Sequence, residues 1–408
     1  MQLLNRGVEF ANLPEHNVKQ YYRGAEVEKL VYDSHPLMEL LPKDEKFRGV
    51  SAPIPVYYTR PQGRSATFST AQSAASASKI GEFLLTRKAN YGVATISGEA
   101  VAASEGDRYS FLNAMTTEID GVMRSVGDSI SRNLYRDGSG AIGRINNSSF
   151  ATTALDLVTD MDSLNFEVGM TLQVSGTKSG GSVRSGTLTV SGVNRGATSD
   201  QITMSGNLSG WSSVAQNDYI YQSGDYDGAL TGLEGWLPAT APGSTAFFGQ
   251  DRTADITRLS GQRYDGSSGT ILEALIEGAA LCSRESGKPD HMFCSFADFV
   301  SIEKAMNAQV QREVKASDSV SGYRSLEFYA PHGVVKIIPD KDCPGSTAYM
   351  LELGTFSLMS IGSCVQLTEL DGNRVLRQSA DDGIEVRVHS YSQLACTAPG
   401  RNCVVTLP

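Results

Sequence analysis

The sequence is poor in cysteine and has no apolar run long enough to cross a membrane. All six cysteines lie in the last third of the chain, and no two form a C-x-x-C pair. This spacing argues against a zinc or redox motif, so we expect free, mostly buried thiols. The start of the chain, Met1 to Arg6, also lacks the apolar core of a signal peptide. We therefore expect synthesis in the cytosol and no membrane partner.

An excess of basic residues is missing too. The chain has 35 Lys and Arg against 45 Asp and Glu, a formal net charge of -10. Proteins that grip nucleic acid through its phosphates need a basic face. The composition therefore argues against a protein that binds nucleic acid through its phosphates, and we expect no sequence-specific DNA binding.

Recognisable catalytic motifs are absent. There is no G-x-S-x-G elbow, Walker A loop, H-E-x-x-H motif or EF-hand loop. The scattered histidines lack a second histidine at helical ligand spacing, and so do not indicate a metal site. They are His16, His35, His291, His332 and His389.

A few side chains remain as weak candidates for a site. Cys396 and Cys403 have no adjacent ligand partner, and the acidic pairs Asp381–Asp382 and Asp225/Asp227 are explained more simply as turn residues than as Ca²⁺ ligands or catalytic acids. We predict no catalytic, cofactor-binding or metal-binding residue. The expected role is structural or binding, and not that of an enzyme.

What the sequence does contain is turn and strand signals. Its 408 residues suffice for two or three domains, and 41 glycines with abundant Ser and Thr indicate many turns and strands. Helical and strand patterns both occur, so the expected class is α+β with more sheet than helix.

One long amphipathic helix is predicted over residues 107–136. Its apolar residues follow spacings of three and four, which places them on one face. They are Leu112, Met115, Ile119, Val122, Val126, Ile130 and Leu134. Gly121 and Gly127 inside the helix suggest that another backbone passes close to it. Residues 104–107 resemble a capping box, and the glycines after Arg136 end the helix.

An extended hairpin is predicted before this helix. Ile54–Tyr58 reads as one strand and 82–98 as a second, with Phe83, Leu85, Ala89, Tyr91, Val93 and Thr95 on one face. Between them, 60–79 has almost no apolar bulk except Phe68. A two-stranded hairpin is marginal alone, so it needs a surface, supplied by a neighbouring copy or by its own domain.

The remaining segments differ in character. Residues 1–50 read as a loosely attached arm with short helical patches that must lie against something larger. Short alternating strands between 148 and 224 indicate a small inserted β-barrel or sandwich. From 225 onward helices, over 270–286 and after a capping box at Ser295–Asp298, mix with strands.

In this order, the segments resemble the major capsid protein family of tailed bacteriophages, which shares its fold with encapsulins. The stretches that carry the resemblance are Pro36–Pro42, Ile54–Tyr58, Ile96–Ser104, Phe111–Gly121, Asn133–Gly140 and Gly232–Gly235. The strongest is the long helix that ends in Asp137-Gly138-Ser139-Gly140, soon after a hairpin of small residues.

The resemblance implies a division of the chain into segments. These are an N-terminal arm (1–50), an extended loop (51–100), a peripheral domain with a spine helix (101–147), an inserted domain (148–224), an axial domain (225–382) and return strands of the peripheral domain (383–408).

The resemblance also implies a function. The chain would assemble as hexamers and pentamers into an icosahedral shell around double-stranded DNA, in a virion formed in the host cytoplasm. Scaffold, portal and decoration proteins are possible partners, and any scaffold would be a separate protein. Some relatives form Lys–Asn cross-links, and Lys79 lies in the right loop. Its Asn and Glu partners have no match here, so that activity is not carried over.

Two alternatives remain open at this stage. One is an encapsulin-like compartment for enzyme cargo, built on the same fold. The other is a ligand-binding or carbohydrate-binding protein that uses the inserted β domain.

Overall fold

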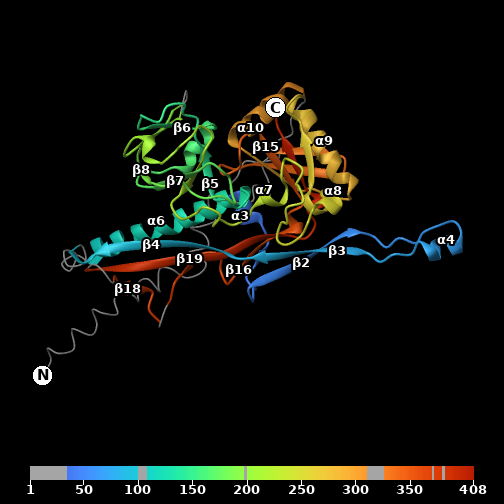
Figure 1. Ribbon diagram of the computed structural model, residues 1–408, viewed down its shortest axis with the longest axis horizontal. Coiled ribbons are helices and arrows are strands. Elements are labelled where there is room, and N and C mark those ends of the chain that lie inside the picture. Colours follow the sequence, from blue (N-terminus) through green and yellow to red (C-terminus); the bar gives the residue numbers. More distant parts are fainter. Residues whose placement is uncertain (1–34, 100–107, 197–199, 310–325, 370–371, 379–381) are drawn as a thin grey trace.

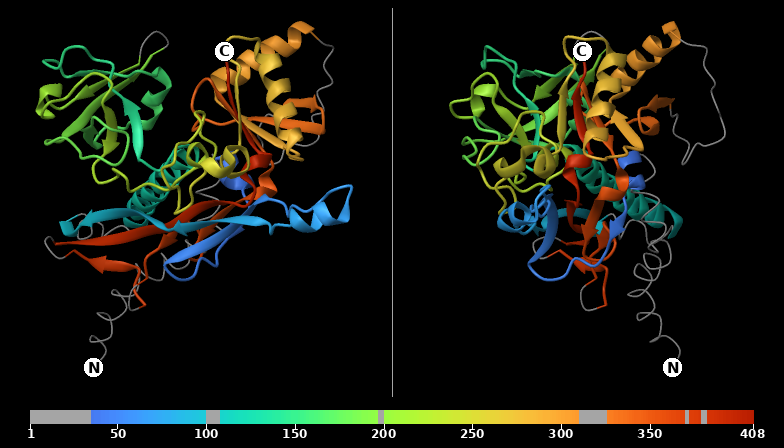
Figure 2. Two further views of the ribbon diagram at one scale, coloured as in Figure 1. Left: turned by 45° about the vertical axis from the view of Figure 1, so that its right-hand side comes forward. Right: turned by 90° about the vertical axis from the view of Figure 1, so that its right-hand side faces the viewer.

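The structure is a computed structural model that describes residues 35–99, 108–196, 200–309, 326–369, 372–378 and 382–408. It is elongated, with long strands and a long helix along its main axis and two compact lobes on one side (Figures 1 and 2). Helices and strands mix throughout, which confirms the expected α+β class.

A six-stranded sheet, here called the peripheral sheet, is the base of the molecule. Its central strand β19 (Gly383–Cys396) pairs with β4 (Lys88–Ser97) over ten residue pairs. The other members are β1 (Lys43–Asp44), β16 (Phe356–Ser360), β17 (Gln366–Leu367) and β18 (Val375–Arg377).

The helix α6 (Arg108–Tyr135) lies along one face of this sheet, as Figure 1 shows. Ile119, Val126, Ile130 and Leu134 are buried, as the spacing predicts. The side chains of Leu112 and Met115 lie outside the described residues, and so does the predicted capping box at 104–107. The helix ends where Gly138 and Gly140 adopt positive φ angles of 94° and 83°, a region that favours glycine.

The close backbone approach comes from the strand and not from Gly121. No atom lies within 4 Å of a Cβ built on Gly121, so the prediction is wrong for Gly121. For Gly127, which is buried, it stays a prediction. A Cβ on Gly92 of β4 would lie 2.5 Å from Val122 and 2.8 Å from Val126. The missing side chain of Gly92 is thus what lets the helix settle on the sheet.

The predicted strand over 82–98 is in fact two strands. β3 (Lys79–Thr86) ends before Arg87 and β4 begins after it. The guanidinium of Arg87 lies over the Phe47 ring and donates to the carbonyl of Gly49. This interruption reverses the alternation, so Phe83 and Leu85 are buried whereas Ala89, Tyr91, Val93 and Thr95 are exposed.

β3 pairs instead with β2 (Ser51–Thr59) in a two-stranded ribbon. Between the two strands the chain forms a short helix, α4 (Phe68–Ser73), at the far end of the ribbon. We call residues 46–81 the projecting arm, since its outer half extends beyond the body of the molecule (Figure 1).

The second sheet forms one of the two lobes. Its order is β11-β20-β15-β12-β14-β13, and the helices α9 (Ile271–Arg284) and α10 (Phe296–Gln309) belong to the same lobe. The strands are β11 (Gln262–Asp265), β12 (His291–Cys294), β13 (Leu326–Ala330), β14 (Gly333–Pro339), β15 (Thr347–Leu351) and β20 (Cys403–Thr406).

Both long helices of this lobe begin directly after a residue whose side chain caps the first turn. Thr270 and Glu273 form a reciprocal capping box on α9. The Ser295 hydroxyl and Asp298 are paired at the start of α10, as the sequence predicted. Short helices α3 (Pro36–Leu40), α7 (Leu233–Trp236) and α8 (Ile256–Ser260) connect the sheets.

The third sheet is the other lobe, with its own core around Phe166, Leu172 and Trp211. Its strands, in order across the sheet, are β5 (Ala141–Arg144), β10 (Tyr219–Gln222), β7 (Thr171–Ser175), β8 (Leu188–Arg195), β9 (Asp200–Met204) and β6 (Ala154–Asp156). The chain enters and leaves this lobe at one place, since Asp227 N donates to Ser139 O at 2.9 Å. Such adjacent ends are what an inserted domain requires.

Sheet membership crosses the predicted segment boundaries at three places. β5 precedes 148 yet belongs to the sheet of the inserted lobe. β16, β17 and β18 lie within 225–382 yet belong to the peripheral sheet, and β20 lies within 383–408 yet belongs to the second sheet. Strands distant in sequence are interleaved in space, which sequence order alone does not reveal.

All six cysteines are free and buried, as predicted. Among the described residues, no helix is both long enough and apolar enough to span a membrane.

The contact at Gly92 makes a prediction about stability. Gly92→Ala should lower the free energy of unfolding by about 1–3 kcal/mol, because its Cβ overlaps Val122 and Val126. Gly121→Ala is the matched control: it meets no neighbour and should raise stability by up to about 1 kcal/mol. Urea unfolding followed by circular dichroism measures both, and a stabilising Gly92→Ala would contradict the packing described.

Candidate assembly surfaces

The structure brings the weak candidate residues into no common site. Asp227 accepts a hydrogen bond from Gly180 N at 2.9 Å, and Asp382 is exposed on the peripheral sheet. His332 is bonded to Ser283 and to Pro289 O, and His389 to Thr368, whereas His16 and Asp381 lie outside the described residues. In the part of the chain that the structure describes, no three metal-ligating side chains gather.

The root of the projecting arm, which we take as Tyr58 on β2 and the continuation of β3 through Phe83 and Leu84, is firmly held. Phe83 is fully buried, with its ring centroid 5.1 Å from that of Trp236 in an edge-to-face contact. The Trp236 indole donates to Leu394 O at 3.0 Å, which joins the arm to the peripheral strand β19. Leu84 N donates to Phe248 O at 2.9 Å, and Arg258 donates to Tyr58 O at 2.7 Å.

The outer half of the arm has no such support. Almost every residue from 59 to 80 is exposed or only half-buried, and Phe68 at the start of α4 is 82% exposed. The two sides of the tip contact one another at Gln62 and Ser76 and little else. Phe68 is one of several large apolar side chains that the protomer leaves exposed, with Val50 and Tyr57 on the same arm.

A cleft of about 490 Å³ lies at the arm's root. It opens between β2 and the turn that carries Gly400 and Arg401, and Arg60, Arg258 and Glu285 also line it. Arg258 is paired with Glu285 at 2.9 Å and Arg401 with Glu352 at 3.2 Å. Two of the three arginines that line the cleft are therefore paired with acids, and Arg60 makes no ion pair with a described residue.

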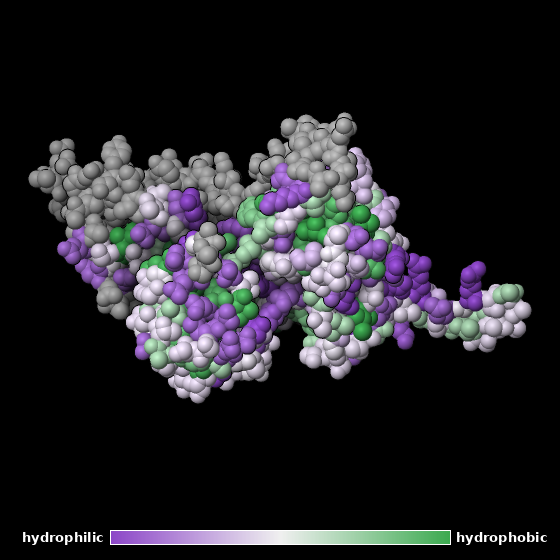
Figure 3. Space-filling view, turned by 90° about the horizontal axis from the view of Figure 1, so that it is seen from above, coloured by the Kyte–Doolittle hydropathy of each residue, from purple (hydrophilic) through white to green (hydrophobic). Residues whose placement is uncertain are grey.

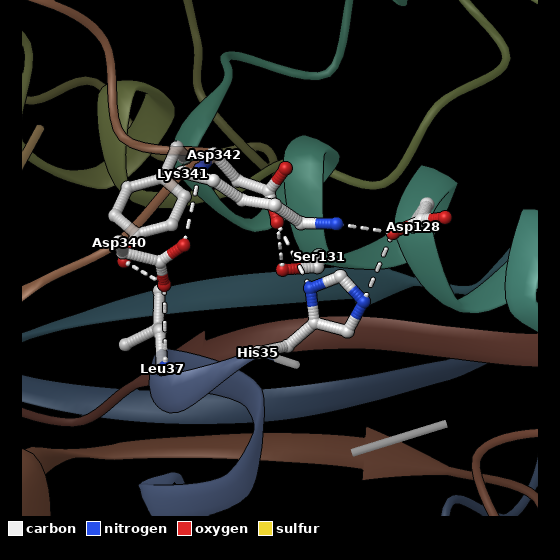
Figure 4. Close-up of polar contacts among 8 residues, drawn as sticks. His35, Leu37, Asp128, Ser131, Asp340, Lys341 and Asp342 are labelled. Carbon is white, nitrogen blue, oxygen red and sulfur yellow. Dashed lines mark hydrogen bonds and ion pairs between the residues drawn. The ribbon is translucent and has the colours of Figure 1, made fainter. Parts of the chain in front are cut away.

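His35, the first residue that the structure describes, lies in a buried ionic cluster, shown in Figure 4. His35 is 3% exposed, and its ring nitrogens lie 3.0 Å from Asp342 Oδ2 and 3.2 Å from Asp128 Oδ1. Lys341 bridges to Asp128 at 2.6 Å, and the Ser131 hydroxyl donates to Asp342 at 2.6 Å. We call these five residues the His35 cluster.

The His35 cluster ties together three distant parts of the chain. His35 directly precedes α3. Asp128 and Ser131 lie on α6, which we call the spine helix, and Lys341 and Asp342 follow β14. Beside it, the carboxylate of Asp340 accepts from the Tyr135 hydroxyl at 2.7 Å, a second link between the helix and the same loop.

Charge–charge contacts fix the ionisation of this cluster. Burial by itself would lower the pKa of His35, but hydrogen bonds to Asp128 and Asp342 outweigh it and raise the pKa to about 9. Burial would likewise raise the pKa of Asp128, but His35 and Lys341 lower it to about 2. The imidazolium of His35 and the carboxylate of Asp128 are thus charged together at neutral pH.

The inserted lobe is also tied to the end of the spine helix. Arg136 pairs with Asp162 at 2.8 Å, and Lys178 bridges Asp137 at 3.1 Å and Glu234 at 2.5 Å. Burial disfavours the charged form of Lys178, yet the two carboxylates outweigh it and raise its pKa. These pairs are partly buried and so are screened less than surface pairs.

Sequence reasoning missed both ionic clusters. In the sequence His35 is only one of five scattered histidines, because its partners are distant and no local spacing connects them. The aspartate–lysine–aspartate run at 340–342 is the one signal that could have marked the place.

No family model and no curated protein matches the sequence. Solved structures do match it. A chain of the Cyanophage A-1(L) capsid asymmetric unit is 11% identical, with a TM-score of 0.53, and the match covers 92% of this chain and 93% of that chain.

Two further solved structures align over similar lengths. The capsid of the native GTA particle is 8% identical over 91% of this chain and 90% of that chain, with a TM-score of 0.45. The virus-like particle from Pyrococcus furiosus is 8% identical over 94% and 96%, with a TM-score of 0.39. Because these scores lie below 0.5, the assignment rests on the cyanophage chain: the protein has the major capsid fold of tailed phages.

The His35 cluster predicts a pH dependence. Since the folded-state pKa of His35 is above its ordinary value of 6.5, its stabilisation is complete below about pH 6.5 and is lost as the pH rises through about 9. Urea unfolding at pH 7 and pH 10 should show His35→Ala destabilising by on the order of 2 kcal/mol at pH 7 and much less at pH 10.

The matched control is His332→Ala, which removes a histidine bonded to Ser283 and to Pro289 O, with no carboxylate partner. It measures how far the removal of any hydrogen-bonded histidine changes stability at each pH. Equal losses at pH 7 and pH 10 for His35→Ala would contradict the ionic role of the cluster.

Proposed function

We propose that this chain is a major capsid protein that assembles as hexamers and pentamers into an icosahedral shell around the double-stranded DNA of a tailed phage. The observation that carries the proposal is the projecting arm on a chain with the capsid fold. The protein would belong to a virion, and its shell would form in the cytoplasm of the bacterial host.

The arm supports this proposal because contacts within one protomer do not stabilise the conformation of its outer half. Fixing the backbone of a residue costs roughly 1–2 kcal/mol, and this cost is normally offset by burial. The outer residues of the arm bury almost nothing in the protomer. Contact with another copy, repeated around a closed shell, would supply the missing burial.

The charge of the chain supports a container for DNA. With a net charge of -10, the protein would repel phosphates on average, so that packaged DNA does not adhere to the wall. Scaffold, portal and decoration proteins would be its further partners. We propose no cofactor and no catalytic role.

The alternatives are less well supported. A cargo compartment of the encapsulin type would use the same fold, but it gives no reason for the inserted lobe and the long arm. A ligand-binding role would place a pocket in the inserted lobe, yet the interior of that lobe is filled by Phe166, Leu172, Trp211 and their neighbours.

Removing the end of the arm tests the proposal. Replacing 60–78 with a short Gly-Ser turn should leave the melting temperature within about 2 °C, because those side chains make few contacts in the protomer. Shell formation, seen by negative-stain electron microscopy and size-exclusion chromatography, should be lost.

A matched control shortens the exposed loop 239–245, which changes chain length without touching the arm. That variant should still form shells. Normal shells from the arm deletion, with the control behaving alike, would contradict the assembly role of the arm.

The inserted lobe permits a second deletion. Because the chain enters and leaves it at Ser139 and Asp227, joining Gly140 to Asp225 through one or two glycines should give a folded body. We expect assembled shells that dissociate at lower urea concentration, since the lobe would brace neighbouring copies. Unfolding of the remaining body would refute the lobe as an independent insertion.

A further inference from the structure

Two of the six buried cysteines lie in the same part of the lobe that is built on the second sheet. Cys282 is on α9, and Cys403 is the first residue of β20. Both are 0% exposed and belong to one hydrophobic core. The surface above them, seen in Figure 3, mixes hydrophilic and hydrophobic residues. The fold thus gathers two thiols from distant parts of the chain into one buried place.

The direction in which α9 crosses β20 follows from two glycines. A Cβ built on Gly278 would lie 2.5 Å from Val405 Cγ2, so the helix lies very close to the strand at this point. A Cβ built on Gly287, just after the helix, would lie 2.9 Å from the Cα of Arg401. As the residue number rises along α9, it therefore falls along β20, and the two elements are antiparallel.

This arrangement brings the two cysteines level with each other. From Gly278 to Cys282 the helix advances four residues, or about 6 Å, and stays on the same face. From Val405 to Cys403 the strand goes back two residues, or about 6.5 Å, and also stays on the same face. Cys282 therefore lies against Cys403, and the two thiols are hydrogen-bonded.

The fold gives Cys403 no second cysteine partner among the residues of this core. Cys294 is on β12, and β15 separates β12 from β20 in the sheet. Two strand spacings amount to about 9.6 Å, whereas the Cα atoms of a disulfide lie less than about 7 Å apart. The remaining cysteines that the structure describes belong to the other core, that of the body, and are Cys343, Cys364 and Cys396.

We propose that Cys282 and Cys403 form an intramolecular disulfide when the protein meets an oxidising environment. The bond joins α9 to β20 and closes a loop that contains most of the lobe. Closing a long loop stabilises a folded chain mainly by restricting the unfolded one. The thiols stay free in the reducing cytosol, and the bond forms outside the cell. This last step rests on the proposed function, because a shell is what would carry the chain out of its host.

The reaction is an exchange with a small-molecule disulfide such as oxidised glutathione. One cysteine thiolate attacks a glutathione sulfur and releases one glutathione thiolate. The second cysteine then attacks this mixed disulfide, forms the S–S bond within the protein and releases the second glutathione thiolate. The two released thiolates take up the two protons that the cysteines lose, and the oxidant gains two electrons.

Burial makes this reaction slow. The hydrogen bond with Cys282, together with burial, raises the pKa of Cys403, so little thiolate is present. Neither thiol is exposed to a reagent in the closed lobe. Oxidation therefore proceeds through local opening of α9, and urea below the unfolding transition should accelerate it.

The test counts thiols on the purified full chain. After incubation with oxidised glutathione in urea below the unfolding transition, the chain should lose two of its six free thiols, measured with Ellman's reagent after unfolding. Mass spectrometry of its peptides should find those of Cys282 and Cys403 joined. The melting temperature should rise by roughly 5 °C and return on reduction with dithiothreitol.

Single variants supply the controls. Cys282→Ala and Cys403→Ala should each keep their five thiols and show no rise in melting temperature on oxidation. Cys294→Ala is the matched control, since it removes another fully buried thiol of the same core. It should still lose two thiols and gain stability. Melting temperatures of the reduced variants show that each is folded.

Three results would overturn the inference. They are a wild type that keeps all six thiols, a bond between any other two cysteines such as Cys294 and Cys343, and glutathione adducts with no S–S bond within the protein. These measurements need no shells. A chain that is oxidised as expected but never assembles would therefore refute the proposed function alone.

Discussion

The packing of the spine helix on strand β4 is the contact on which the other parts depend. It needs a strand without a side chain at Gly92, so that Val122 and Val126 can approach. The C-terminal half of the same helix, with Arg136 directly after its last residue, then holds three attachments. These are the His35 cluster at Asp128 and Ser131, the Tyr135–Asp340 hydrogen bond, and the ion pair of Arg136 with the inserted lobe.

Because the centre of the molecule is firmly packed, the exposed outer half of the projecting arm is held in a defined position. The arm leaves a root buried under Phe83 and Trp236, and its outer half reaches past the body with few contacts. A rigid root with an uncovered end is what contact between copies requires, because the end is positioned before any partner arrives.

The sequence predicted the parts with a strong local period well. The long helix, the capping boxes and most strands after 225 follow from spacing alone, and the resemblance supplied the order of the segments. Sequence reasoning failed where the answer depended on distant partners. It predicted a close backbone approach at Gly121 that the structure lacks, and it placed the wrong face of 88–97 with Phe83 and Leu85. It also assigned β16 and β20 to segments other than those whose sheets they join. The His35 cluster joins residues some 300 positions apart, and no local pattern marks such a cluster.

Electron cryomicroscopy of the purified, assembled protein tests the central claim most directly. The account predicts closed shells in which residues 60–78 of each copy lie against another copy. A protein that stays monomeric at every concentration and salt condition, or shells in which the arm touches only its own protomer, would contradict it.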